Sequence, residues 1–250
     1  MKPIHRNVLG GVAVLLLAIL FARLGVWQLD RRHQRQARNA AWTRALALPA
    51  LPLDSARCAA IAENPAAYRY RRVRVRGAYD PAGQVLLRSR SMDGRPGVHV
   101  VTRLDVSEAP YAVLVNRGWT YAPDGAAQAV PTPPPAGAVE VDGVLQEISV
   151  SADRGLPSVS RSAGTPVTTL RHLDLATLRA RSPRPLLPLF VQQLPASAAD
   201  DRTAALRPVP LPELDEGPHL SYAVQWFSFA VIAVVGYLVL VLRRREPDGR

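Results

Sequence analysis

The chain lacks the residue patterns on which most enzyme and metal sites depend. Cys58 is its single cysteine, which excludes an internal disulfide, a CxxC redox pair and a CxxC copper or zinc site. Its five histidines are dispersed and no two stand four residues apart, so there is no local two-histidine metal site. Glycine-rich phosphate loops, G-x-S-x-G and H-E-x-x-H are also absent. The sequence therefore predicts no catalytic residues and a protein that is not an enzyme.

Two uncharged apolar runs stand near the ends of the chain. The first covers residues 8–22 and continues through Arg23 to Leu29, and the second covers residues 220–242. A helix that crosses a bilayer needs about 20 predominantly apolar residues. The first run reaches that length if Arg23 extends its charge to the interface. We predict transmembrane helices over 8–29 and 220–242.

A cleaved signal peptide is the alternative interpretation of the first run, because Lys2 and Arg6 precede it. However, Leu20-Phe21-Ala22 is a poor small-x-small cleavage site, and the run continues to Trp27. These features favour an uncleaved anchor.

Two spans place both termini on one side of the membrane. Arg243-Arg244-Arg245, directly after the second run, predict a cytoplasmic C-terminus, because positive charge favours the cytoplasm. The four arginines that follow the first run argue the other way: Arg31, Arg32, Arg35 and Arg38. We give more weight to the second run, which is longer and is not interrupted by a charged residue. Both termini are then cytoplasmic and residues 30–218 lie outside.

The charge balance is strongly basic, with 31 Lys and Arg against 20 Asp and Glu. Such a balance is also typical of nucleic-acid binding. Here many of the cations flank the two apolar runs, where basic residues meet anionic lipid headgroups, and the others are interspersed with acids. We therefore expect membrane lipid, and no nucleic acid, as a partner.

Between the apolar runs the pattern is mostly that of β-strands. Residues 71–79 alternate arginine with valine, as in a half-buried strand whose arginines face solvent. Asp80-Pro81-Ala82-Gly83 predicts a turn, and residues 84–88 a returning partner strand. A second turn is expected at 94–97. Further strands are expected at 98–104, 111–116, 139–148 and 186–194. The fold class is thus an α+β membrane protein, in which two terminal transmembrane helices flank one mainly antiparallel β domain.

Helices in this domain are expected to be few and short. Residues 30–48 continue the first span as a charged, alanine-rich stretch, and short helices are expected at 55–62 and 172–180. Four prolines make 207–218 a semi-rigid linker to the second span. The prolines in 126–137 predict a loop, and 153–164 is expected to be another.

His219 differs from the other histidines because it stands where the second apolar run begins. On a helix it shares a face with Tyr222, Ala223 and Trp226. An imidazole at the membrane boundary above aromatic rings is a plausible axial ligand for haem iron. The alternative is a headgroup-level residue of the interfacial aromatic belt. The residues alone leave both interpretations open.

Five segments resemble, in order, the motifs of the Surfeit locus protein 1 family. The first, Gly25-Val26-Trp27-Gln28-Leu29-Asp30-Arg31-Arg32, stands at the exit of the first span. The others are residues 72–80, 97–102, 113–119 (Val-Leu-Val-Asn-Arg-Gly-Trp) and 219–227. Arg103 departs from the pattern, since the family usually has proline there. The family also has two terminal spans and a large loop outside the cytoplasm.

The resemblance implies an assembly factor, or chaperone, for haem–copper cytochrome c oxidase in the bacterial inner membrane, with the main domain periplasmic. It implies transient binding of haem a, with the oxidase catalytic subunit and other assembly factors as partners. His219 would then ligate iron, with three aromatic residues beside the ring: Trp27, Tyr222 and Trp226. Arg31 and Arg32 would pair with the haem propionates, since guanidinium matches carboxylate geometry.

Two rival interpretations remain. In the first, the protein is a membrane-anchored scaffold that docks on an oxidase subunit and never binds haem. Its contact would be Asn116-Arg117-Gly118-Trp119, with Arg117 and Trp119 as anchors; a core position for Trp119 is the alternative. In the second, the chain is a membrane-tethered enzyme, which a clustered pair of carboxylates or a reactive Cys58 would support, although Cys58 lies in an alanine-rich helix that we expect to be buried.

Overall fold

The computed structural model describes residues 3–126, 132–148, 158–162, 165–195, 206–212 and 214–243. The chain divides into two compact units, and each is described by itself. The helical unit consists of residues 1–41 and 213–250, and the β unit of residues 42–212.

Two long helices form the helical unit. Helix α1 covers Pro3–Ala47, so that its last residues belong to the β unit, and α4 covers His219–Arg243. Both are long and apolar enough to cross a membrane, and the expected spans 8–29 and 220–242 lie within them. The expected helical continuation of the first span through 30–48 is confirmed to Ala47.

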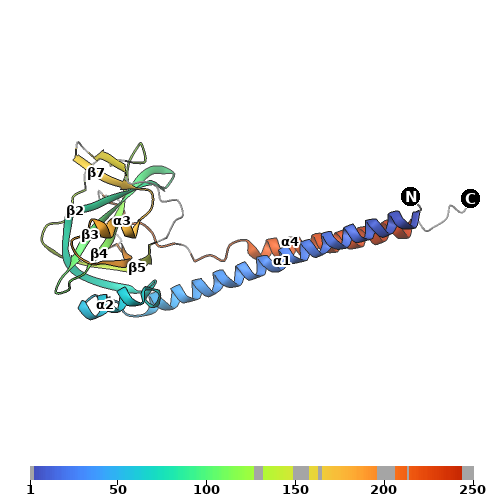
Figure 1. Cartoon of the computed structure of the whole chain (residues 1–250), viewed down its shortest axis with the longest axis horizontal. Helices are drawn as coiled ribbons and strands as arrows, with labels where there is room; N and C mark the ends of the chain where they lie inside the picture. Colours follow the sequence, from blue (N-terminus) through green and yellow to red (C-terminus); the bar gives the residue numbers. More distant parts are fainter. Residues whose placement is uncertain are drawn as a thin grey trace, which may run out of the picture. The chain divides into compact units, whose positions relative to one another are not determined.

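Helices α1 and α4 run side by side (Figure 1). The ring of Phe21 lies 5.6 Å from that of Trp226 and 5.8 Å from that of Phe229. A Cβ on Gly25 would lie only 2.7 Å from Cε1 of Phe227. Glycine at this position therefore allows the close approach of the two helices, as small residues do between membrane helices.

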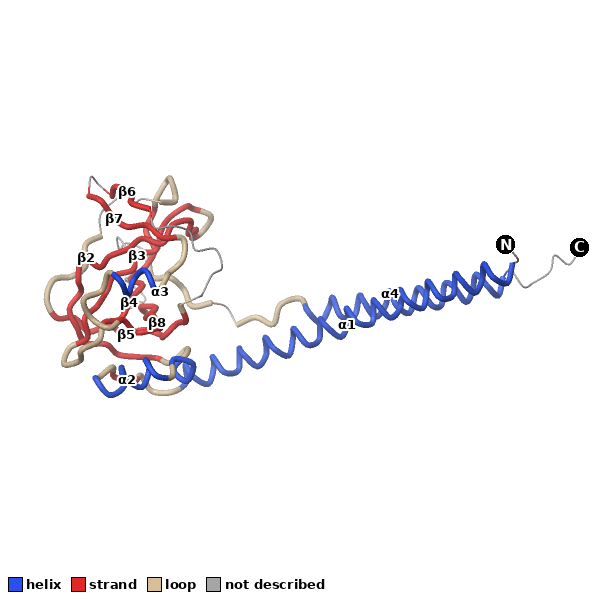
Figure 2. The backbone as a smooth tube through the Cα atoms, in the orientation of Figure 1, coloured by secondary structure: helices blue, strands red, loops and turns tan. Residues whose placement is uncertain are grey.

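The described residues of the β unit form eight strands and three short helices. Figure 2 shows that this unit consists mainly of strands. The strands are β1 (Leu51–Pro52), β2 (Arg72–Met92), β3 (Arg95–Val106), β4 (Ala112–Tyr121), β5 (Ala138–Glu147), β6 (Ser158–Ser162), β7 (Thr165–Leu170) and β8 (Leu186–Gln193). The helices are α2 (Ser55–Glu63), a 3₁₀ turn at Pro65–Tyr68 and α3 (Leu175–Ala180). Asp54 caps α2 and Asp174 caps α3, each accepting hydrogen bonds from backbone N–H groups of the first turn.

The sheet closes on itself. Its order is β3-β4-β8-β5-β2-β7-β6, and β2 also pairs with β3, so β2, β3, β4, β8 and β5 form a ring. Three of the pairings are parallel: β1–β2, β2–β7 and β4–β8. The sheet is therefore mixed, and the expectation of a mainly antiparallel domain is correct only for part of it.

The largest apolar cluster lies on the valine face of β2. Val73 and Val75 are fully buried, whereas Arg72, Arg74 and Arg76 between and beside them are exposed. Arg74 pairs with Asp142 at 2.9 Å on the neighbouring strand β5. The arginine stripe is thus a solvated, ion-paired face, as the alternation predicts. Helix α2 covers this cluster with Cys58 and Ile61.

The expected hairpin of residues 71–79 and 84–88 is wrong. Both segments belong to one long strand, β2, which pairs antiparallel with β3 on either side of an irregularity between Asp80 and Val85. A Cβ on Gly83 would lie 2.7 Å from Cβ of Arg103 on β3. The turn-like sequence therefore forms a bulge that accommodates Arg103.

The chain reverses one residue earlier than the turn expected at 94–97. The reversal lies at Asp93-Gly94, where both residues have positive φ, and Arg95 already pairs with Met92 on the preceding strand.

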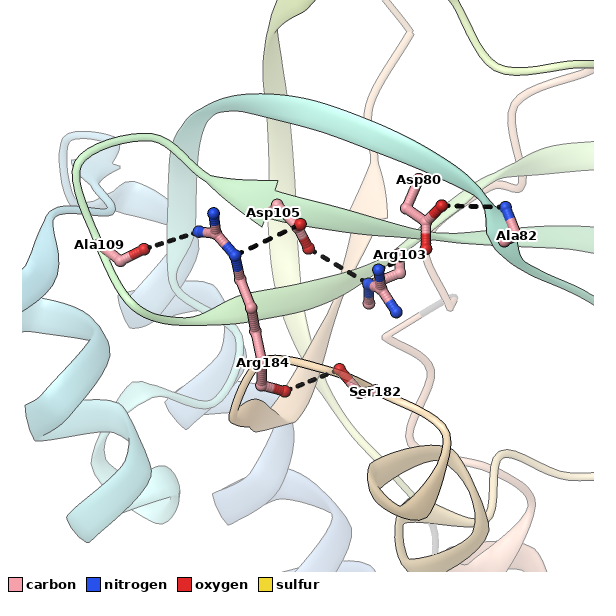
Figure 3. A network of polar contacts seen from close by, with 7 residues as sticks. All are labelled: Asp80, Ala82, Arg103, Asp105, Ala109, Ser182 and Arg184. Carbon is pink, nitrogen blue, oxygen red and sulfur yellow. Dashed lines mark hydrogen bonds and ion pairs between the residues drawn. The ribbon is translucent and has the colours of Figure 1, made fainter.

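Arg103 is buried inside a network of charges (Figure 3). It pairs with Asp80 and, at 3.2 Å, with Asp105. Asp105 also lies 3.4 Å from Arg184, which donates a hydrogen bond to the carbonyl of Ala109 at 3.0 Å. The arginine that departs from the family's usual proline is therefore held by two carboxylates.

Two loop expectations concern segments that are only partly described. Residues 158–162 of the expected loop 153–164 form strand β6, which pairs with β7, so that part of the expectation is wrong. Residues 127–131 of the other loop lie outside the described residues, and 132–137 contain no strand. The expected linker begins inside the β unit, because Arg207 exchanges two backbone hydrogen bonds with Trp119.

Candidate functional site

His219 is the first residue of α4 and contacts α1. Its Nδ1 lies 2.9 Å from Oε1 of Gln28. An amide oxygen only accepts hydrogen bonds, so this contact requires a proton on Nδ1, and in the corresponding neutral tautomer Nε2 keeps its lone pair. This is the usual support for a metal-binding histidine, whose second nitrogen is oriented by an oxygen acceptor.

Three aromatic residues near His219 are placed differently from one another. Trp27 and Tyr222 are half exposed, at 49% and 46%. Trp226 is partly buried and packs on Phe21, so it helps to hold the helices together. Of the expected shared face, His219, Ala223 and Trp226 are turned toward α1, whereas Tyr222 is exposed.

The arginines after the first span have different partners. Arg31 lies over the ring of Trp27, at 5.4 Å, and donates a hydrogen bond to Gln34. Arg32 is paired with Glu216 at 2.9 Å. Among the described residues, no carboxylate pairs with Arg31.

Asp215 and Glu216 fasten the chain before α4 onto the polar part of α1. Arg35 pairs with Asp215, and Gln36 donates a hydrogen bond to Glu216 at 2.9 Å. Hydrogen bonds from Gln36 and Arg32 lower the pKa of the Glu216 carboxyl. These contacts fix the start of α4, and with it His219, against α1.

The donor set limits what the site can bind. Among the described residues, no group of three or more His, Cys, Asp or Glu side chains could hold a metal ion. One imidazole with a free Nε2 suits iron that a macrocycle already coordinates, since such iron takes one or two axial ligands from the protein.

The four residues Asn116-Arg117-Gly118-Trp119 lie in β4, away from this site in the sequence. Asn116 and Trp119 are buried at 3% exposure each, and Arg117 is partly buried. Asn116 donates a hydrogen bond to Gln192 at 2.9 Å, and Arg117 donates to the carbonyls of Thr132 and Pro133 at 3.0 Å. Burial raises the pKa of Tyr79, beside Arg117, to about 12. This environment favours the core interpretation of Trp119, and a partner contact through these residues stays a prediction.

Sequence reasoning missed Gln28, Asp215 and Glu216. Gln28 stands inside the motif that begins at Gly25, but only the rotation of α1 shows that its side chain meets His219. The opposite charges of 215–216 and of Arg32 and Arg35 were a signal that could have paired these segments.

Comparison with known proteins decides the family. The sequence model of the SURF1 family matches residues 15–231, which is most of the chain. The chain belongs to the SURF1 family. Relatives include uncharacterized SURF1-like proteins of Mycobacterium bovis and of Mycobacterium tuberculosis, each 29% identical over 244 residues, which is 95% of this chain and 86% of the relative. The SURF1 family is known in general for cytochrome oxidase assembly and is not a catalytic family.

Proposed function

We propose that this SURF1 family member binds haem a at the start of α4 and assists its insertion into the catalytic subunit of cytochrome c oxidase. The observation that carries the proposal is the hydrogen bond between His219 Nδ1 and Gln28, which leaves Nε2 as a potential iron ligand. In this role the protein binds and transfers, and it makes or breaks no covalent bond.

The residues present fit a haem. His219 would ligate the iron, and exposed Trp27 and Tyr222 offer aromatic surface for an apolar ring. Arg31, without a carboxylate partner among the described residues, would pair with a propionate. Arg32 could do so only after release from Glu216. When bound, haem a supplies the iron centre that the oxidase requires.

The proposal includes a location. Helices α1 and α4 would cross the bacterial inner membrane, with both termini cytoplasmic and the β unit in the periplasm. Haem is apolar with two carboxylates, which suits a site at the boundary between lipid and water. The oxidase catalytic subunit and other assembly factors would be the partners.

The test uses full-length protein purified from cells that make haem a. We expect the His219→Ala variant to lose the iron-ligand bands of the absorption spectrum while it remains inserted. His33 is an exposed histidine on α1 and serves as the matched control. The His33→Ala variant should leave the spectrum unchanged. An unchanged spectrum in His219→Ala protein contradicts the ligand assignment.

Gln28→Leu tests the orienting hydrogen bond. Loss of such a partner costs about 10–100-fold in metal affinity, so haem binding should weaken while the ligand stays the same. Nitrogen NMR of the haem-free protein gives an independent readout, because the proton on His219 should no longer favour Nδ1. If wild-type protein never carries haem although oxidase assembly depends on it, the scaffold without haem is the better account.

A further inference from the structure

The β unit contains a cavity that the proposed haem site does not use. Its volume is about 330 Å³, and residues of β2, β3, β4, β5 and β8 line it together with His172 and Leu173. Ligand pockets in proteins typically measure about 300–1,000 Å³, so the cavity is large enough for a small molecule.

Arg90 brings a positive charge to this cavity without a compensating carboxylate. One of its N–H groups donates to the carbonyl of Arg171 at 2.9 Å. No carboxylate among the described residues pairs with it, and Glu147, which also lines the cavity, is paired with Arg69 at 2.9 Å. Burial, and then the charge of Arg171, lower the pKa of Arg90. An anion in the cavity would therefore be attracted to this side chain.

His99 adds a donor whose direction is fixed. Its Nδ1 lies 3.3 Å from Nδ2 of Asn116, which also donates to Gln192, while Oδ1 of Asn116 accepts from the N–H of Gly118. Nδ1 of His99 is therefore the acceptor, and Nε2 carries the proton. Burial lowers the pKa of His99 to about 4, so the ring is neutral at neutral pH. Its Nε2–H has no hydrogen-bond partner in the part of the chain that the structure describes.

Gln146 and three apolar side chains also line the cavity. Nε2 of Gln146 is buried without a partner among the described residues, and a buried donor without a partner is destabilising. Leu87, Leu173 and Phe190 form an apolar wall. Hydrogen-bond donors without partners thus lie beside an apolar wall. A ligand that suits this lining has a hydrogen-bond acceptor group attached to a short apolar chain.

We propose that this cavity binds a small carboxylic acid, with the carboxylate on Arg90 and His99 and the chain against Leu173 and Phe190. A monoanion fits better than a phosphate, because Arg90 is the single uncompensated cation among the described lining residues. A planar carboxylate also matches the two parallel N–H groups that guanidinium presents. The inference is independent of haem binding.

The test is a titration of full-length protein in an uncharged detergent with butanoate and with butanamide, which has the same chain and no charge. We expect butanoate to bind at least about tenfold more tightly, since charge-assisted hydrogen bonds are the stronger ones. Nitrogen NMR of the unmodified protein should show the His99 Nε2 signal shifting with butanoate. Equal binding of the two compounds, or no shift at His99, overturns the proposal.

Arg90→Gln should weaken butanoate binding by about tenfold or more, through loss of a charged partner. Arg88 lies on the same strand but does not line the cavity, so Arg88→Gln is the matched control and should bind as wild type. Equal weakening in both variants would indicate general electrostatic attraction and contradict a specific site. Because haem spectra are measured separately, failure here is distinguishable from failure of the proposed function.

Discussion

Arg103 keeps its charge in the interior of the β unit, with 9% of its side chain exposed. It pairs with Asp80 and Asp105, so its removal would leave Asp80 without its cation and Asp105 with only Arg184, which lies at 3.4 Å. Breaking a buried ion pair by removing one partner is strongly destabilising, because the remaining charge is desolvated. The cost therefore comes from the carboxylates that stay behind.

We expect Arg103→Met to lower the free energy of unfolding by about 3–5 kcal/mol, measured by urea denaturation of the detergent-solubilised chain. Arg76→Met is the control, since Arg76 is 78% exposed in its pair with Glu140, and such surface pairs contribute about 0–1 kcal/mol. Adding Asp80→Asn to Arg103→Met should recover part of the loss. Equal losses from the two single arginine variants would show that the network is not a buried one.

His99 gives the β unit a pH dependence whose sign follows from burial. Its pKa falls from 6.5 to about 4 in the folded protein, so the unfolded chain binds more protons between these values. Stability should therefore decrease as pH falls from 6.5 toward 4, by up to about 3 kcal/mol. Unfolding free energies across this range should show a flatter slope for His99→Gln, and an unchanged slope for the control His33→Gln. A wild-type slope in the His99 variant would contradict the prediction.

Among the elements, the helix pair depends on a glycine. The Cβ of any larger residue at Gly25 would meet the ring of Phe227, whereas a Cβ at Gly236 on α4 has nothing within 4 Å. We expect Gly25→Val to separate the helices near His219, and Gly236→Val to leave them together. A short bis-maleimide should link cysteines placed at Phe21 and Phe229, in a Cys58→Ser background, only when the helices pack. Cross-linking that survives Gly25→Val would contradict this packing.

The elements also show what the sequence could predict. Run length and charge predicted both long helices, and alternation predicted the two faces at the start of β2, because burial on one face imposes that period. Pairing was less predictable. Asp80-Pro81-Ala82-Gly83 has turn chemistry, but its use as a bulge depends on Arg103, which is some 20 residues away in the sequence. Local patterns do not contain such contacts.

The same limit applies to the candidate site. The position of His219 at the start of the second apolar run indicated a candidate ligand, and the resemblance to a known family indicated Trp27 and Arg31. Gln28 was not singled out, since its function depends on which side of α1 faces α4. Likewise, the pairing of Arg32 with Glu216 joins residues that are separated by most of the chain.

For the whole molecule we predict an orientation in the membrane in which both termini are cytoplasmic. The charges give conflicting signals, because arginines follow the first apolar run as well as the second. The contacts of the helical unit offer a reason for this conflict. Arg32 and Arg35 are paired with Glu216 and Asp215, so they bind a partner within the fold. Charges that are neutralised in this way need not report the cytoplasmic side, so we expect Arg243 and its two neighbours to determine the orientation.

We therefore expect a reporter that is active only outside the cytoplasm to stay silent when fused after Arg250 and to be active when inserted after Ala126. A second reporter, active only inside the cytoplasm, should give the inverse result at the same two positions. Replacing the three arginines 243–245 by Gln should reduce this asymmetry, because it removes the positive charge that holds the C-terminus inside. Replacing Arg32 and Arg35 by Gln is the matched control and should leave the orientation unchanged. Activity of the first reporter at Arg250 in the wild-type chain would place the β unit in the cytoplasm and contradict a periplasmic role.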